Sequence, residues 1–326
     1  MASGPPIRLG PTPPPTPAGD SGVRQQATYL AYAGGWRAVR MMPGPVAHAA
    51  FEQLADQQWR TRSGGVRQLE ANLARVLGPV DADQLRTVSR EGMRTYMRYW
   101  CDAFRLPGWD EAQLDSFELR NGRRLSEPVA QGRGVVAALP HMGNWDHAGA
   151  HVSRRISPVN TVAERLEPAR LYEAFLEFRT SLGMHIHGLG EPGVYQQLCQ
   201  ALDSGGLVAL LADRDLSATG IDVEFFGQTA RFPAGPAALA VDTGAALVPA
   251  TLWWAGHNIA DIGPEIVPPA HGSRQERIRA TTQAVADALA AGIAAHPAHW
   301  HMLQRLWLSD LDPERLARSD REGGGS

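Results

Sequence analysis

Apolar residues recur along most of the chain with the spacing of helices, and they also gather in three short runs that have no polar face. Apolar positions three and four residues apart predict helices over residues 23–42, 45–62, 65–77, 82–104, 144–154, 168–182, 192–203, 235–243 and 273–295. The uninterrupted apolar runs cover residues 134–139, 206–212 and 246–253. Such runs are typical of strands buried on both faces. Their alternation with helices predicts an α/β fold with a central, mostly parallel β-sheet flanked by helices.

The two ends of the chain lack these patterns. Residues 1–22 are rich in Pro, Gly, Ser and Thr, a composition that buries no core, and we expect a disordered tail there. Residues 313–326 end in Gly-Gly-Gly-Ser and are expected to form a tail or linker. Residues 23–312 are therefore predicted to form one domain, a size that a single hydrophobic core can support.

Composition and charge narrow the classes of function. The net charge of -3 gives no reason to expect a nucleic-acid partner. All 31 Lys and Arg positions are arginine, which binds phosphate groups bidentately. The two cysteines, Cys101 and Cys199, are too few for a disulfide framework or a four-cysteine zinc site, and they indicate a reducing compartment.

Membrane contact, if it occurs, is expected at the surface. No apolar run reaches the roughly 18–20 residues that span a bilayer, and the N-terminus lacks the apolar core of a signal peptide. The predicted helix over 23–42 combines Tyr, Trp and Arg side chains, which suit the interface with an anionic membrane. Packing of that helix against the domain core is the alternative interpretation.

The strongest local signal for chemistry is the segment Leu-Pro-His-Met-Gly-Asn-Trp-Asp around His141. Pro140 ends a buried strand, so His141 lies at the carboxyl end of that strand, where open α/β sheets place their active sites. Gly143 permits a sharp turn into a helix that begins near Asn144. Across this turn we expect Asp146 to fold back onto His141 and to hold its imidazole in one tautomer. The alternative is a chance His and Asp beside a turn.

Other patterns compete with this one. His147 and His151 have the spacing of a two-histidine metal site, but no third ligand accompanies them, so we predict no metal. Gly132-x-Gly134 precedes the strand instead of following it, which excludes a dinucleotide-binding loop. The absence of a Gly-x-Ser-x-Gly elbow, and of a cysteine near His141 in the sequence, argues against an acyl-enzyme.

The segment Pro-His-Met-Gly-Asn-Trp-Asp resembles the H-x4-D/E motif of the glycerolipid acyltransferases. A longer series of blocks resembles the bacterial lipid A biosynthesis acyltransferases, and most closely their actinobacterial branch, the phosphatidylinositol mannoside acyltransferases. These blocks are residues 66–78, 98–107, 161–166, 178–179, 211–216, 223–227, 232–240 and 295–304. They follow the family's order and extend the resemblance over roughly residues 25–312.

The resemblance implies transfer of a fatty acyl chain, expected to be palmitoyl, from acyl-coenzyme A (acyl-CoA) to a mannose hydroxyl of a phosphatidylinositol mannoside. It implies His141 as general base and Asp146 as its partner, with no cofactor beyond the acyl-CoA substrate. Asp213 is the third catalytic candidate, in a position where the family pattern has Glu, and it could reach His141 directly or through water. A protein of this family is expected on the cytoplasmic face of the cell membrane.

The predicted substrate-binding residues are Asn144, Glu164, Arg179, Arg214, Phe226 and Gly227. By resemblance, Glu164 and Arg179 form an ion pair lining the site. Arg214 is a candidate phosphate ligand and Phe226 a candidate wall of a lipid groove, with ordinary surface and strand roles as alternatives. Backbone N–H groups near residues 143–145, or Arg179, are expected to stabilise the tetrahedral oxyanion of acyl transfer.

Three other functions compete with this prediction. The first is acyl transfer to another glycolipid or to a lysophospholipid. The second is a thioesterase or lipid hydrolase in which the histidine activates water, against which the predicted acceptor-lipid block at 223–240 argues. The third is a lipid-binding protein without activity, against which the intact His141–Asp146 motif argues.

Overall fold

The computed structural model describes residues 34–163, 169–215, 217 and 219–311. The predicted tails lie outside these residues, as does the first part of the helix predicted over 23–42. Residues 34–41 of that segment are helical.

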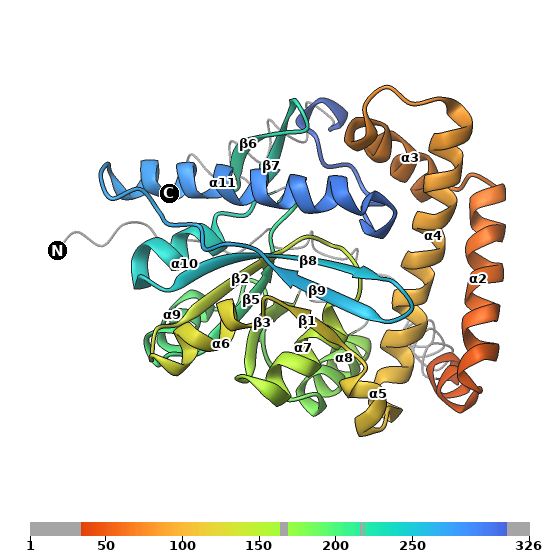
Figure 1. Cartoon of the computed structure of the whole chain (residues 1–326), viewed down its shortest axis with the longest axis horizontal. Helices are drawn as coiled ribbons and strands as arrows, with labels where there is room; N and C mark the ends of the chain where they lie inside the picture. Colours follow the sequence, from red (N-terminus) through yellow and green to blue (C-terminus); the bar gives the residue numbers. More distant parts are fainter. Residues whose placement is uncertain (1–33, 164–168, 216, 218, 312–326) are drawn as a thin grey trace, which may run out of the picture.

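A seven-stranded sheet forms the centre of the molecule, in the order β1-β9-β8-β2-β5-β3-β4 (Figure 1). Its strands are β1 (Glu118–Arg120), β2 (Val135–Leu139), β3 (Val159–Ala163), β4 (His185–Gly188), β5 (Leu207–Leu211), β8 (Ala246–Trp254) and β9 (Asn258–Ile262). Neighbouring strands are parallel except for β8 and β9. The three strands predicted from sequence are the adjacent central ones, and every residue of β2 is buried. The predicted mostly parallel α/β fold is therefore confirmed.

Helices cover both faces of the sheet, which explains why its central strands have no polar face. One face packs against α9 (Val194–Asp203), α10 (Gly235–Thr243) and α11 (Arg274–Ala295). The other face packs against α5 (Glu111–Asp115), α6 (Arg123–Ala130), α7 (Trp145–Arg155) and α8 (Ala169–Ser181). The two resulting apolar layers hold the carboxyl ends of β2 and β5 in fixed positions.

Three further helices lie beside the carboxyl edge of the sheet: α2 (Gly44–Arg60), α3 (Gly64–Leu77) and α4 (Ala82–Arg105). Figure 1 shows α2 on the outer side of α4. The buried carboxylate of Asp56 on α2 binds Arg90 and Arg94 of α4, with N–O distances of 2.5 and 2.9 Å. This contact, together with apolar packing, fixes α2 to α4.

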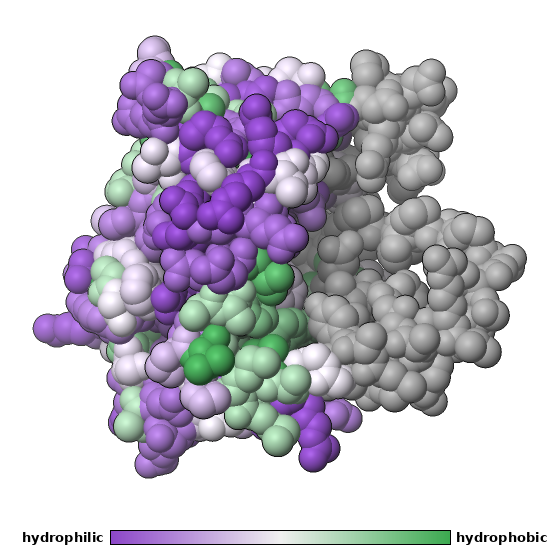
Figure 2. All heavy atoms as spheres, turned by 90° about the vertical axis from the view of Figure 1, so that its right-hand side faces the viewer, coloured by the Kyte–Doolittle hydropathy of each residue, from purple (hydrophilic) through white to green (hydrophobic). Residues whose placement is uncertain are grey.

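Large apolar side chains are exposed where the chain enters α2. Met41, Met42, Val46 and Leu54, here called the α2 patch, are 76, 37, 55 and 45 % exposed. Figure 2 views the molecule from this side and shows apolar surface bordered by hydrophilic side chains. Contiguous exposed apolar surface often marks a site of contact with a partner or a membrane.

The segment after α11 crosses the carboxyl edge of the sheet. It contains the short helices η2 (Pro297–His299) and η3 (Leu308–Asp310). The backbone N–H of Gly143 donates to the carbonyl oxygen of His299 over 3.1 Å, and that of His301 donates to His141 over 2.7 Å. Gly143 has a φ of 60°, and a Cβ there would lie 2.7 Å from the backbone of Leu252. The C-terminal segment and this glycine therefore fix the loop that carries His141.

Candidate active site

His141 and Asp213 meet because two parallel strands bring them to the same level. Leu139 of β2 lies opposite Leu211 of β5, and each candidate residue follows two positions later. Oδ1 of Asp213 is 2.6 Å from Nδ1 of His141, and Oδ2 accepts the backbone N–H of His141 over 3.0 Å. Asp213 therefore contacts the imidazole directly, which settles the choice between direct contact and contact through water.

Burial by itself raises the pKa of Asp213, but His141 and the hydrogen bonds from Trp300 and the backbone outweigh burial and lower it. Although Asp213 is fully buried, this lowered pKa means that its carboxylate is ionised at neutral pH. An ionised carboxylate at Nδ1 keeps the proton on that nitrogen and leaves Nε2 as the basic atom. The His141 side chain is 30 % exposed, so a substrate can reach it.

Asp146 is not the partner of His141, and that prediction is wrong. Its carboxylate accepts hydrogen bonds from Nε of Arg179 over 2.8 Å and from the hydroxyl of Tyr99 over 2.9 Å. Asp146 is the second residue of α7, and the start of this helix directs its side chain toward α4 and α8. The local turn brings Asp146 near the site, but α4 and α8 supply its partners.

Arg179, Asp146 and Tyr99 form a buried polar cluster beside the histidine. Burial by itself lowers the pKa of Arg179, but the charge of Asp146 outweighs burial and holds that pKa above its usual value. Burial and the neighbouring carboxylate also raise the pKa of Tyr99, so its hydroxyl stays protonated as a donor. The predicted partner of Arg179, Glu164, lies outside the described residues.

An apolar cavity extends from this cluster into the space between α7 and the sheet. About 100 Å³ of it is open to the centre of a water molecule, within about 800 Å³ of atom-free space that includes open solvent. Its apolar lining includes Leu139, Val152, Val159, Leu207, Leu211 and Leu252. Polar groups gather where Trp145, Asp146 and Arg179 line it. The cavity can accept part of an apolar group, and its lining residues Leu139 and Trp145 lie two and four positions from His141 in the sequence.

The remaining predicted substrate-binding residues have different surroundings. Asn144 caps α7, because its Oδ1 accepts the backbone N–H of His147 over 2.9 Å. Arg214 follows Asp213 and is half-buried, with no ion pair among the described residues. Phe226 and Gly227, with φ values of 49° and 73°, form the turn between β6 (Ile221–Phe225) and β7 (Gln228–Phe232). Neither Phe226 nor Gly227 lines the cavity described above, and their part in substrate binding stays a prediction.

Two residues of the site were not singled out from the sequence. The indole N–H of Trp300 donates to Oδ2 of Asp213 over 2.9 Å and fixes the second carboxylate oxygen. The His301 ring is buried against Tyr99 and Trp145, and neither ring nitrogen has a hydrogen-bond partner among the described residues. Both lie in the block 295–304, which the resemblance includes, but their contacts span long sequence separations that no local pattern reveals.

The buried histidines predict a loss of stability in acid. Burial lowers the pKa of His299 to about 4 and that of His301 to about 3, whereas an unfolded histidine titrates near about 6.5. As the pH falls below about 6.5 the unfolded chain binds protons that the folded chain does not, so the free energy of unfolding decreases by roughly 1–3 kcal/mol per pH unit. Urea unfolding at pH 7.5 and 5.5 measures this slope.

The matched variants are His301→Asn and His271→Asn, the second at an exposed histidine. We expect His301→Asn to reduce the slope and His271→Asn to leave it unchanged. An unchanged slope in His301→Asn would show that its imidazole takes up a proton in the folded protein as readily as in the unfolded chain.

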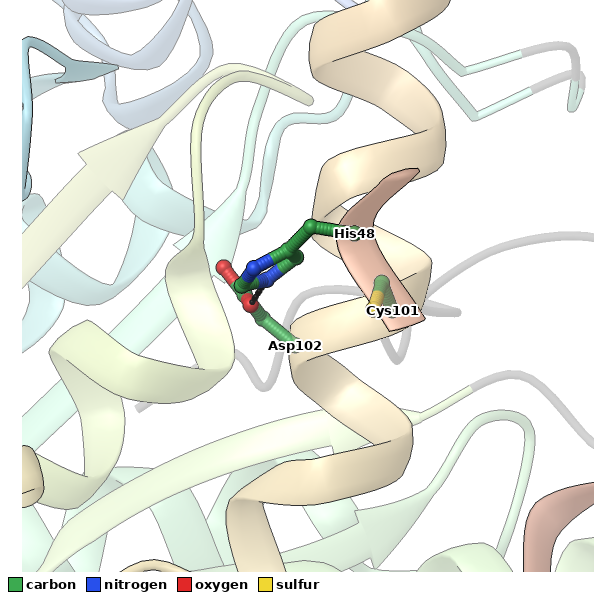
Figure 3. Close-up of side chains that lie close together, drawn as sticks. All are labelled: His48, Cys101 and Asp102. Carbon is green, nitrogen blue, oxygen red and sulfur yellow. Dashed lines mark hydrogen bonds and ion pairs between the residues drawn. The ribbon is translucent and has the colours of Figure 1, made fainter. Parts of the chain in front are cut away.

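Among the described residues, His48, Cys101 and Asp102 form a group of possible metal ligands, with their ligand atoms within 4.8 Å of one another. Figure 3 shows the His48 ring directed at Asp102, and Nε2 lies 2.7 Å from Oδ1. Burial and the charge of Asp102 raise the pKa of the Cys101 thiol to about 12, so the thiol is protonated. The group therefore fits a polar contact between α2 and α4 better than a metal site.

The second candidate metal site predicted from the sequence, His147 with His151, also has other contacts. Nε2 of His147 lies 3.0 Å from the carbonyl oxygen of Leu114, and Nδ1 lies 3.1 Å from the side chain of Asn258. Both ring nitrogens of His147 are therefore occupied by hydrogen bonds, which leaves no lone pair for a metal shared with His151.

The amino-acid sequence of this chain is similar to those of known acyltransferases. Residues 20–309 match the family model described as bacterial lipid A biosynthesis acyltransferase. The phosphatidylinositol mannoside acyltransferase of Mycolicibacterium smegmatis is 44 % identical over 296 residues, covering 90 % of this chain and 95 % of the relative. The protein of the same name from Mycobacterium tuberculosis is 43 % identical over 304 residues, covering 91 % and 94 %.

Proposed function

The chain belongs to the bacterial lipid A biosynthesis acyltransferase family, and from this premise we propose that it transfers a fatty acyl chain from acyl-CoA to a mannose hydroxyl of a phosphatidylinositol mannoside. The observation that carries the proposal is the His141–Asp213 pair beside an apolar cavity. The names of the relatives support the acceptor, and the cavity supports a long acyl chain.

The proposed chemistry is a direct transfer. Nε2 of His141 removes the proton of the hydroxyl as its oxygen attacks the thioester carbonyl carbon. The tetrahedral intermediate then collapses, the C–S bond breaks, and the coenzyme A thiolate takes the proton from the imidazolium. Asp213 stabilises that imidazolium through its contact with Nδ1. The products are an ester and free coenzyme A, and no acyl-enzyme is needed.

The apolar cavity suits the acyl chain, which we expect to be palmitoyl. Burial of apolar surface contributes about 25 cal/mol per Å², so a long chain binds more tightly than a short one until it reaches the end of the cavity. Arg214 supports recognition of a phosphate group, because it follows Asp213 in the chain, is half-buried and has no ion pair among the described residues. Both substrates carry phosphate, so this feature does not distinguish donor from acceptor.

The acceptor is a membrane lipid, and the α2 patch supports peripheral binding to the cytoplasmic face of the membrane. Met41 of this patch lines a hollow together with the exposed Arg37 and Arg40, and the combination of apolar and basic side chains favours an anionic lipid surface. Within the described residues, no helix has the length and apolar character needed to cross a bilayer. We propose that this face rests on the membrane and leads the acceptor toward His141.

This proposal predicts that the double variant Val46→Glu/Leu54→Glu binds vesicles containing phosphatidylinositol at least tenfold more weakly, a change of about 1.4 kcal/mol. The new carboxylates remove apolar contact and are repelled by anionic headgroups. Sedimentation with vesicles measures the binding. The matched control is Val267→Glu, because Val267 is 75 % exposed outside the α2 patch. Equal binding by the double variant and wild type would contradict the assignment of this face.

The function is tested with radiolabelled palmitoyl-CoA and vesicles that contain phosphatidylinositol mannoside, a lysophospholipid or neither. The proposal predicts labelled mannoside and little free fatty acid without an acceptor. Preferred labelling of the lysophospholipid would assign the other acceptor. Free acid released at the same rate without any acceptor would instead identify a thioesterase.

A further inference from the structure

Acyl transfer needs a hydrogen-bond donor for the oxyanion, and the structure has already engaged two of the expected donors. The backbone N–H of Gly143 donates to the carbonyl oxygen of His299. Arg179 donates through Nε to Asp146 over 2.8 Å. These two groups are therefore already engaged through the atoms named, which leaves a role for a further donor close to His141.

Trp145 carries such a donor. Its indole nitrogen is buried and has no acceptor among the described residues. Buried polar groups without a partner are rare in folded proteins, and each one calls for an explanation, such as a ligand or water that binds there. Trp145 also lines the apolar cavity at its polar end, together with Asp146 and Arg179.

The position of the ring fits this role. Trp145 is the first residue of α7, and its ring stands nearly perpendicular to that of His141, with 6.0 Å between the ring centroids. The Tyr99 ring packs against the Trp145 ring with a centroid distance of 4.0 Å, and the Tyr99 hydroxyl donates a hydrogen bond to Asp146. Packing therefore fixes the indole next to the base before any substrate binds, which is the arrangement that makes oxyanion donors effective.

We propose that the indole N–H of Trp145 donates a hydrogen bond to the carbonyl oxygen of the acyl thioester and binds the oxyanion that this oxygen becomes. When the hydroxyl oxygen adds to the carbonyl carbon, the electron pair of the C=O bond moves to the oxygen. When the C–S bond breaks, this pair re-forms the C=O bond. The indole is a donor only, so it stabilises the charge throughout and leaves proton transfer to His141.

The proposal rests on the proposed acyl transfer, and Trp145→Phe tests it while keeping an aromatic ring against Tyr99. We expect kcat for palmitoyl transfer to fall by about 10²–10³-fold, the loss typical of one oxyanion donor, with KM for palmitoyl-CoA within about threefold of wild type. The matched control is Trp59→Phe, whose indole N–H donates to Ser89 over 3.1 Å and which we expect to be fully active. Unchanged kcat in Trp145→Phe overturns the proposal.

A second variant distinguishes loss of the N–H group from a folding defect caused by the smaller Phe side chain. β-(3-Benzothienyl)alanine at position 145 keeps the shape of the indole and replaces only its N–H group with sulfur. It is expected to fold as wild type does, as judged by its thermal midpoint, and to lose the same factor in kcat. Full activity of this variant would show that the N–H group contributes nothing.

The carbonyl stretch of bound palmitoyl-CoA, labelled with ¹³C at the carbonyl, gives a readout that a structural role would not change. In His141→Ala, where we expect transfer to be at least about 10³-fold slower, the hydrogen bond from Trp145 should lower the stretching frequency. In His141→Ala/Trp145→Phe it should return toward the value of a free thioester, and equal frequencies in the two proteins overturn the proposal. If wild type does not use palmitoyl-CoA at all, the proposed function fails first, whereas an active Trp145→Phe variant contradicts the role of Trp145 alone.

Discussion

Asp213→Asn is expected to lower kcat for acyl transfer by roughly 10³–10⁴-fold and to change KM by less than about threefold. The carboxylate lies 2.6 Å from Nδ1 of His141 and keeps the proton on that nitrogen. An amide in its place can donate to Nδ1, which moves the ring proton to Nε2 and removes the basic atom from the substrate side. It also removes the negative charge that stabilises the imidazolium. Steady-state kinetics with saturating acceptor measures both constants.

The matched control is Asp215→Asn, two residues further along the same loop. Asp215 is also buried, but its carboxylate accepts the backbone N–H of Ser217 over 2.7 Å and is engaged there. We expect this variant to keep near wild-type kcat. Comparable losses in both variants would mean that the loop as a whole is disturbed, and a fully active Asp213→Asn would remove Asp213 from the mechanism.

Asp146→Leu is expected to destabilise the folded protein by about 3–5 kcal/mol. The Asp146 side chain is 2 % exposed and that of Arg179 is 19 % exposed, so the change leaves a largely buried guanidinium without its counter-charge. Arg179→Met should reduce the free energy of unfolding by a similar amount, because it leaves the buried carboxylate of Asp146 without its counter-charge. The double variant Asp146→Leu/Arg179→Met should recover most of the lost stability, because apolar side chains of similar volume often replace a buried ion pair without loss of stability. Urea unfolding measures all three.

A more conservative substitution, Asp146→Asn, distinguishes a role of Asp146 in stability from a role in catalysis. Asp146→Asn retains an acceptor for Tyr99 and Arg179, and we expect a smaller loss of stability than in Asp146→Leu together with a smaller loss of kcat than in Asp213→Asn. The opposite result, wild-type stability with a loss of kcat as large as that of Asp213→Asn, would contradict the structural role argued for Asp146.

The sequence predicted those parts of the fold whose residues follow a strong pattern. β2, β5 and β8 were identified because both faces of each are covered and almost every position is apolar. The strands β1 and β4 were not predicted, because they are three and four residues long and carry partly exposed side chains at the sheet edges. The two-residue turn at Phe226 was missed because the pattern there shows only aromatic residues and a glycine.

The candidate base His141 was identifiable from its own neighbourhood, but the carboxylate that contacts it was not. His141 follows a buried strand and a proline, a context contained in a few residues. Asp146 is near it in the sequence, and local reasoning chose it for that reason. Asp213 is 72 residues away from His141, and the pairing of Leu139 with Leu211 is what brings the two together. Trp300, which completes the set, lies further still along the chain, so family resemblance pointed to its block without giving its role.

We propose that His141, held by Asp213, is the base for acyl transfer to a lipid hydroxyl. The most direct test measures formation of labelled acyl-phosphatidylinositol mannoside from palmitoyl-CoA by wild type and by His141→Ala at matched concentrations of folded protein. We expect product that depends on the acceptor with wild type, and a rate at least about 10³-fold lower with His141→Ala. Wild-type rates of product formation by His141→Ala would contradict it.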